Sequence, residues 1–243
     1  MTYKVVKFFT SRTEDPEVFC VSMLGDNRRP TKLHVRTSAR FESDTLDYIE
    51  LYGIWAFVCH FELAGQARNA KNLKVIVSRG AIKRLLRETS SKSNLFQYTN
   101  AMRTQLFGLE DISVEKDGEW ASTVEPTLSL HWDGQPPPYP TVVNDAFGNL
   151  IITRHVLDRY HEKTGYEGKP DGIFAKVTKL ARSAKVEKLL DKSMLNHKSK
   201  KYGAEQDKTI YLQSDADWYF VALKLSEREY LLKTIYQRDD SWE

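Results

Sequence analysis

The feature that most constrains the fold is a proline-rich stretch near the middle of the chain. Residues 131–148 read HWDGQPPPYPTVVNDAFG and contain four prolines within five positions. Proline fixes φ and lacks an N–H donor, so such a run cannot continue a helix or a central strand and favours an extended spacer. We therefore predict two domains, residues 1–130 and 149–243, joined by a Pro-rich linker over residues 131–148.

The composition is that of an ordinary globular protein. Hydrophobic residues make up 41% of the 243 residues and charged residues 28%, which is too apolar for general disorder. No run of 18 apolar residues occurs, and the N-terminus has no apolar signal core, so we expect no membrane contact and a cytoplasmic location. Cys20 and Cys59 lie in apolar stretches without a second cysteine at metal-ligand spacing, which predicts core packing.

The first domain alternates strand-like and helix-like segments. The predicted strands are YKVVKFF, VFCVSMLG and KLHVRTSARF, followed later by LKVIVS and ISVEKD, and the predicted helices cover residues 43–67, 80–89 and 94–108. Enrichment in β-branched and aromatic residues supports the strands, and apolar spacing supports the helices. The expected class is α+β, with a five-stranded mixed sheet in this domain.

This order of elements resembles the ribonuclease H-like fold over about residues 3–120. The resemblance places Glu50 where that family has a helical metal-binding glutamate. The first strand carries no aspartate, however, and the central strand ends in Ser78-Arg79, where two-metal hydrolysis would need further carboxylates. We therefore expect an inactive domain without tight divalent-metal binding, and Glu50 as a solvated or helix-capping residue.

The second domain begins with NLIITRHVLDRYHEKTG, residues 149–165. Its apolar start predicts a short strand, and Thr153 and Gly165 are suited to begin and end a helix. His155 and Arg159 lie four residues apart and should project from the same side of that helix. A second, basic helix over residues 173–190 and three strand-like segments from residue 208 onward complete a two-helix plus antiparallel-meander domain.

The motif Ile-Thr-x-His-Val-x-x-Arg, a second helix and a final strand resemble small bacterial and phage toxin ribonucleases of the RelE, BrnT and colicin D type. The resemblance covers about residues 149–239. It implies catalytic roles for His155 and Arg159 on the helix and for Thr234 and Tyr236 on the last strand, and an antitoxin or other protein partner.

Such chemistry needs no metal or other cofactor. Cleavage by the RNA 2′-hydroxyl requires a proton acceptor, a proton donor and positive charge on the phosphorane. Histidine suits the proton transfer and arginine suits the phosphate, with Tyr236 or His197 completing the transfer. Because Thr234 and Tyr236 are two apart on one strand, they share a face and are expected to point at the helix carrying His155.

Basic residues concentrate after the first helix of this domain. Between Gly172 and Gly203 there are nine basic and two acidic residues, a local net charge of +7. This predicts a surface that binds RNA phosphates. The predicted nucleic-acid-binding residues are Lys176, Lys179, Arg182, Lys185, Lys188, Lys192, His197, Lys198, Lys200 and Lys201. The alternative is a solvated helix, since steps of three residues spiral around a helix.

Two functional hypotheses remain open from the sequence. The first is an RNA-binding, metal-independent endoribonuclease of toxin type, whose N-terminal domain selects or positions the target. The alternative is a non-catalytic nucleic-acid- or protein-binding module built from degenerate nuclease folds, such as a phage-encoded inhibitor or scaffold. In that case His155 and Arg159 are solvent residues, or form ion pairs with Asp158 and Glu162.

Overall fold

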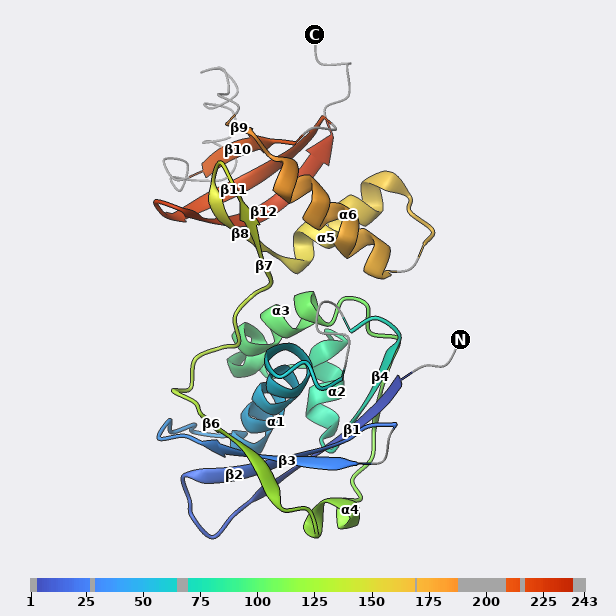
Figure 1. Cartoon of the computed structure of the whole chain (residues 1–243), viewed down its shortest axis with the longest axis vertical. Helices are drawn as coiled ribbons and strands as arrows, with labels where there is room; N and C mark the ends of the chain where they lie inside the picture. Colours follow the sequence, from blue (N-terminus) through green and yellow to red (C-terminus); the bar gives the residue numbers. More distant parts are fainter. Residues whose placement is uncertain are drawn as a thin grey trace. The chain divides into compact units, whose positions relative to one another are not determined.

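The computed structural model describes residues 4–26, 29–64, 70–168, 170–187, 209–214 and 217–237. The chain divides into two compact units, Met1–Pro138 and Tyr139–Glu243 (Figure 1). Each unit contains one six-stranded sheet with both parallel and antiparallel neighbours, together with helices. The predicted α+β class is therefore confirmed. Within the described ranges, no helix is both long and apolar enough to cross a membrane.

The first unit is built on a sheet of order β5-β4-β1-β2-β3-β6. Its strands are β1 (Lys4–Arg12), β2 (Val18–Leu24), β3 (Pro30–Arg36), β4 (Leu73–Val77), β5 (Asp111–Val114) and β6 (Pro126–His131). The strands β1, β2 and β3 form the predicted antiparallel meander, whereas β4 pairs parallel with β1 and β5 parallel with β4. The sixth strand, β6, was not predicted; it pairs parallel with β3, and only Leu128 and Leu130 of it pack against the core.

Helices cover one face of this sheet (Figure 1). They are α1 (Thr45–Trp55), which continues as the π-helix η1 (Ala56–His60), then α2 (Gly80–Leu86), the short 3-10 helix η2 (Ser93–Leu95) and α3 (Phe96–Gln105); a single turn, α4 (Glu119–Ser122), lies apart from them. The packing of α1 on the sheet is close, since a Cβ on Gly53 would lie 2.5 Å from Cγ1 of Val21. α1 also contacts α2 and α3, so it is enclosed on several sides. An enclosed helix is apolar nearly all round, and any charged residue on it faces protein.

The predicted linker of residues 131–148 belongs partly to each unit. Up to Pro138 it is attached to the first unit, because Trp132 packs in the core, Tyr98 OH donates to Gly134 O (2.6 Å) and Gln105 Nε2 donates to Pro138 O (2.6 Å). Residues Thr141–Asn144 form strand β7 of the second unit. The segment is therefore shorter as a spacer than its composition suggested, because backbone carbonyls next to the prolines still accept hydrogen bonds.

The second unit has the sheet order β7-β8-β12-β11-β10-β9. Its elements are β7, β8 (Gly148–Ile152), α5 (Arg154–Thr164), α6 (Pro170–Ser183), β9 (Val186–Glu187), β10 (Thr209–Gln213), β11 (Trp218–Ser226) and β12 (Glu229–Gln237). β10, β11 and β12 form the predicted antiparallel meander, and β8 pairs parallel with β12. α5 packs against β12 and α6 packs against α5.

The two helices of this unit have well-defined ends. Thr153 Oγ1 accepts a hydrogen bond from Val156 N (3.4 Å), and Gly165 ends α5 in the left-handed conformation (φ 57), both as predicted. α6 ends at Ser183, short of the predicted residue 190. Asn144, which is 2% exposed, donates from Nδ2 to the carbonyls of Ala181 (2.9 Å), Arg182 (3.0 Å) and Ala184 (2.9 Å). These carbonyls are satisfied without a further helical turn.

Candidate functional site

Three carboxylates at three-residue spacing lie along α1 in the first unit: Asp44, Asp47 and Glu50. Asp44 occupies the position before the helix in the left-handed conformation (φ 59) and makes no side-chain capping bond. Asp47 and Glu50 are both 0% exposed. Burying two carboxylates is costly unless each is paired or protonated, so their partners define the chemistry of this place.

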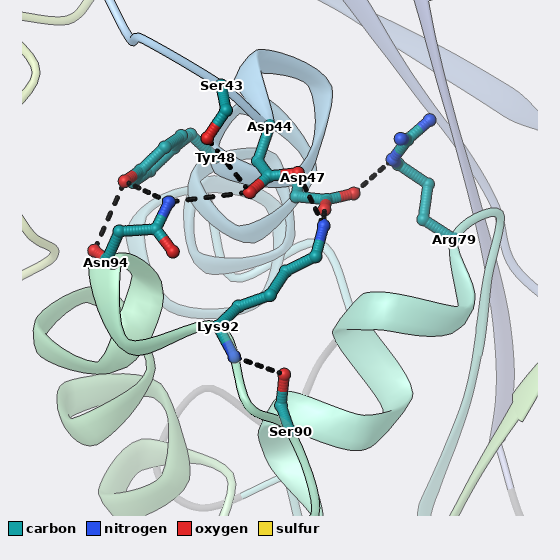
Figure 2. A network of polar contacts seen from close by, with 8 residues as sticks. All are labelled: Ser43, Asp44, Asp47, Tyr48, Arg79, Ser90, Lys92 and Asn94. Carbon is teal, nitrogen blue, oxygen red and sulfur yellow. Dashed lines mark hydrogen bonds and ion pairs between the residues drawn. The ribbon is translucent and has the colours of Figure 1, made fainter.

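Asp47 is held by two cations that come from different segments (Figure 2). Arg79 Nε donates to one carboxylate oxygen, and Lys92 Nζ lies 2.7 Å from the other. The Asp47 side chain is 1% exposed, whereas those of Arg79 and Lys92 are 37% and 30% exposed. The carboxylate is therefore fixed inside the unit, and the cations reach it from the surface.

Lys92 extends the network to the start of α1. Its Nζ also lies 2.5 Å from an oxygen of Asp44, and Asn94 Nδ2 donates to the other Asp44 oxygen at 3.4 Å (Figure 2). Hydrogen bonds to Asp44 and Asp47 raise the pKa of Lys92, and the bond from Lys92 lowers the pKa of Asp44. Both charges are thus retained at neutral pH, and the loop carrying Lys92 is tied to α1.

Glu50 is bonded to the end of β4. Its oxygens accept hydrogen bonds from the backbone N (2.7 Å) and Oγ (2.5 Å) of Ser78. Burial raises the pKa of Glu50 to about 7, although the bonds from Ser78 and the charge of Arg79 oppose the rise. The prediction of a solvated or capping glutamate is therefore wrong, because position 50 faces the sheet from an enclosed helix.

These residues do not fit a divalent metal site. The two oxygens of Asp47 are occupied by the chain's own cations, and those of Glu50 by Ser78. On β1 the group that faces Glu50 is Thr10, a buried hydroxyl. Within the described segments, no group of three or more His, Cys, Asp or Glu is placed to hold an ion. The groups around Asp47 and Glu50 are hydroxyls and cations, whereas a hard metal ion needs several carboxylate oxygens.

In the second unit, the two residues predicted to be catalytic on α5 are both exposed. Arg159 Nη1 lies 2.8 Å from Glu162 Oε2, and Arg154 Nε lies 2.9 Å from Asp158 Oδ1. His155 lies on the same helix, one turn before Arg159. This face of α5 is thus a charge-balanced helix surface.

The structure does not bring Thr234 and Tyr236 to that helix. Tyr236 is paired with Tyr219 on β11, and their rings stack with centroids 5.4 Å apart. The residue before Tyr219 is Trp218, whose ring contacts Tyr160 of α5 at 4.9 Å. Neighbouring residues of a strand point to opposite faces, so Tyr236 lies on the face of the sheet away from α5.

Thr234 follows the same pattern, since it pairs with Val221, two residues beyond Tyr219. The expected convergence of His155, Arg159, Thr234 and Tyr236 is therefore wrong. A spacing of two residues fixes that Thr234 and Tyr236 share a face, but it does not fix which face the helix covers.

The basic helix α6 is half buried and half exposed. Ile173, Val177 and Ala181 are 1% exposed or less, whereas Lys176, Lys179 and Arg182 are exposed, as is Lys185 just after the helix. Lys176 Nζ lies 4.1 Å from the ring centroid of Tyr166. No described acidic side chain forms an ion pair with Lys176, Lys179 or Arg182. Six predicted RNA-binding residues, Lys188, Lys192, His197, Lys198, Lys200 and Lys201, lie outside the described residues.

Two open cavities of about 590 and 390 Å³ lie elsewhere on the first unit and share Val5, Gly25 and Asp26 in their walls. Two of the ionisable groups in these walls are already used within the fold. Lys7 bonds Glu115 at 2.6 Å, and Asp26 Oδ1 accepts from Val5 N at 2.8 Å. Neither cavity includes a residue of the Asp47 and Glu50 network.

No protein-family model matches this chain, and no match is found among curated proteins. Its function must therefore be inferred from the chemistry of its own residues.

Proposed function

We propose that this chain is a non-catalytic RNA-binding protein that contacts the phosphate backbone through α6. The observation that carries the proposal is the contrast between α6 and α5. On α5 both arginines have a carboxylate partner on the same helix, whereas on α6 Lys176, Lys179 and Arg182 have none among the described residues. Unpaired cations on a fixed helix favour binding to a polyanion.

The contacts that hold α6 in the second unit also favour this proposal. The helix is held by its buried apolar side and by Asn144 at its C-terminal end. Its lysines can therefore meet a phosphate backbone without the helix itself being reordered. Contacts of this kind position a nucleic acid but do not read its sequence.

The arrangement of the two predicted nuclease sites favours binding over cleavage. The strand order β5-β4-β1-β2-β3 supports a ribonuclease H-like first unit, and its central position carries Thr10, Glu50 and Ser78 in place of several carboxylates. In the second unit, Thr234 and Tyr236 lie on the sheet face away from α5. Among the residues that the structure describes, neither site brings together the groups that cleavage requires. A cytoplasmic location, where RNA is abundant, is part of the proposal.

The test removes charge from α6 in the full chain. Lys176→Gln, Lys179→Gln and Arg182→Gln together should weaken binding of a fluorescent single-stranded RNA, measured by anisotropy across a range of salt. The slope of log affinity against log salt should fall by about 0.7 for each phosphate that the variant no longer binds. The matched control is the triple variant Arg154→Gln, Arg159→Gln and Lys163→Gln on α5. An equal loss of affinity in both variants would indicate only a general effect of net charge and would overturn the role of α6.

A second measurement addresses catalysis directly. The wild-type chain, incubated with RNA in EDTA, should leave the RNA intact while binding it. Cleavage that is abolished by His155→Ala would overturn the non-catalytic assignment and restore the endoribonuclease hypothesis.

A further inference from the structure

We propose that Ser78, Arg79 and Arg84 form a phosphate-binding site on the first unit, at the C-terminal end of β4. The site is separate from α6 and would take the same ligand chemistry, a phosphate group, from an RNA backbone or from a free nucleotide. It depends on two buried carboxylates that hold consecutive residues, since Asp47 binds Arg79 and Glu50 binds Ser78.

Arg79 is the central group of this site. Its Nε is bonded to the buried Asp47, and Arg79 makes no other hydrogen bond or ion pair among the described residues. Figure 2 shows its two terminal nitrogens directed away from the network, and the side chain is 37% exposed. The free edge of a planar guanidinium matches two phosphate oxygens. An arginine already oriented by a fixed carboxylate loses less conformational freedom when it binds.

Arg84 supplies the second cation of the proposed site. It is exposed on α2, and its Nη1 lies 4.0 Å from the position that a Cβ on Gly80 would take. Among the described residues, no other atom apart from immediate chain neighbours and the helix backbone lies within 4 Å of that position, so the space beside Gly80 is open. Arg84 therefore reaches back along α2 to Gly80, the residue that follows Arg79, and in the proposed site both arginines contact one phosphate.

Arg87, which directly follows α2, shows the contrast. Its Nη2 is committed to Asp111 Oδ1 at 2.9 Å and to the carbonyl of Ile112 at 3.4 Å. Arg87 is thus an exposed arginine with a terminal nitrogen bonded to its own unit, whereas the terminal nitrogens of Arg79 make no such bond among the described residues. This difference makes Arg87 the matched control.

Ser78 adds a hydrogen-bond donor whose availability depends on Glu50. When Glu50 is ionised, the Ser78 hydroxyl donates to it across 2.5 Å. When Glu50 is protonated, the carboxyl donates to Ser78 Oγ, and the serine hydrogen is free for a phosphate oxygen. The other groups facing Glu50 are the Arg79 guanidinium and the hydroxyl of Thr10. Phosphate binding should therefore strengthen as the pH falls through about 7, where the pKa of Glu50 lies.

The first experiment uses the full chain and a short fluorescent single-stranded RNA. Arg79→Gln should weaken binding about tenfold, the size expected for a charge-assisted hydrogen-bonded pair, and should lower the salt slope by about 0.7. Arg79→Lys should give an intermediate loss, since an ammonium lacks the fork. Arg87→Gln should bind like the wild type. Unchanged affinity in Arg79→Gln, or an equal loss in Arg87→Gln, would overturn the proposal.

Folding of each variant is checked by thermal unfolding. If Arg79→Gln does not fold, Arg84→Gln is used to test the site, because Arg84 makes no bond to Asp47. A loss of RNA affinity in Arg84→Gln supports the site, and wild-type affinity overturns it. Competition with inorganic phosphate and with adenosine monophosphate separates the two ligand sources. Displacement of only the Arg79-dependent part of RNA binding indicates a site that accepts free phosphate, and no displacement indicates one that needs the RNA backbone.

The pH dependence gives an independent test. Wild-type affinity for RNA should be higher at pH 6 than at pH 8, and Glu50→Gln should reduce that difference because its amide mimics the protonated acid. An identical pH profile in Glu50→Gln would remove Ser78 from the site.

The RNA-binding results for this site can be distinguished from those for α6. RNA binding that is lost in the α6 triple variant and kept in Arg79→Gln would overturn this site and leave the proposed function standing. The reverse result would support this site and refute the role of α6. A wild-type chain that binds neither RNA nor phosphate would refute both.

Discussion

The two units treat charged groups in opposite ways. The first unit buries Asp47 and Glu50 completely, whereas the buried polar residues described in the second unit, Asn144 and Ser214, are uncharged. Both units contain an arginine bonded to a carboxylate, but the partner of Arg79 is 1% exposed and the partner of Arg159 is 59% exposed. A buried partner fixes an arginine in place, whereas an exposed partner competes with water and holds it weakly.

This difference separates two kinds of phosphate contact. The cations on α6 lie on an exposed helix surface and are suited to a diffuse interaction with a polyanion. Arg79 is held in one orientation and is suited to a single phosphate in a defined position. The α6 cations can be replaced without altering stability, because they lie on the surface. Replacing Arg79 does alter stability, because the carboxylate that orients it lies inside the fold.

The largest effect is expected when Asp47 loses both of its cations. Arg79→Met with Lys92→Met keeps much of the side-chain volume and leaves a buried carboxylate unpaired, which should lower the free energy of unfolding by about 3–5 kcal/mol. Urea unfolding at pH 7 measures it. Asp47→Ala should cost less, because the cations that remain are about one-third exposed and can be hydrated. Equal costs for the two variants would contradict this asymmetry.

A smaller, pH-dependent effect is expected at Glu50. Its pKa rises from 4.5 to about 7 on folding, so the folded state holds the proton more tightly. The stability from this group is present below pH 4.5 and is lost as the pH rises through about 7, by about 3 kcal/mol in total. Glu50→Gln should flatten that part of the profile of unfolding free energy against pH. Glu119→Gln, on the surface helix α4, should leave it unchanged.

In the second unit the comparable buried group is neutral. Asn144→Asp replaces an amide that donates to three carbonyls with a carboxylate that repels them, at the negative end of α6. A loss of about 1–3 kcal/mol is expected, with faster hydrogen exchange in residues 178–184. Partial recovery in acid, where the aspartic acid can donate once, would confirm that the missing donor is the cause. Unchanged exchange would show that α6 does not depend on this contact.

The smallest effect is expected at the exposed pair on α5. Arg159 donates to Glu162 and lowers its pKa, yet both side chains are open to water. Glu162→Gln should therefore leave the thermal unfolding temperature unchanged within error at both low and high salt. A salt-sensitive fall would mean that this pair is held as firmly as Arg79 and Asp47, and the contrast between the units would not stand.

Local sequence patterns determined much of the fold. Side chains that act on their neighbours along the chain account for the strand meanders, for the buried parallel strand LKVIVS and for the capped helix between Thr153 and Gly165. The expected core packing of the two cysteines is also found, since Cys20 is buried and Cys59 packs against the core with its pKa raised to about 12 by burial. The strand β6 was missed because its residues are half-exposed or exposed, so its alternation is weak.

Tertiary structure alone decided the environment of the candidate sites. Periodicity shows which residues share a side of an element, but not which other element covers that side. Glu50 is bonded to Ser78, 28 positions along the chain, and Asp47 is paired with Lys92, 45 positions away. The same limit applies to Tyr236, whose face is determined by α5 packing on Trp218. The sequence by itself determined the helices, the strands and the concentration of positive charge on α6, since these depend on neighbours along the chain; contacts between distant segments decided which charges are buried and which arginine is held in place.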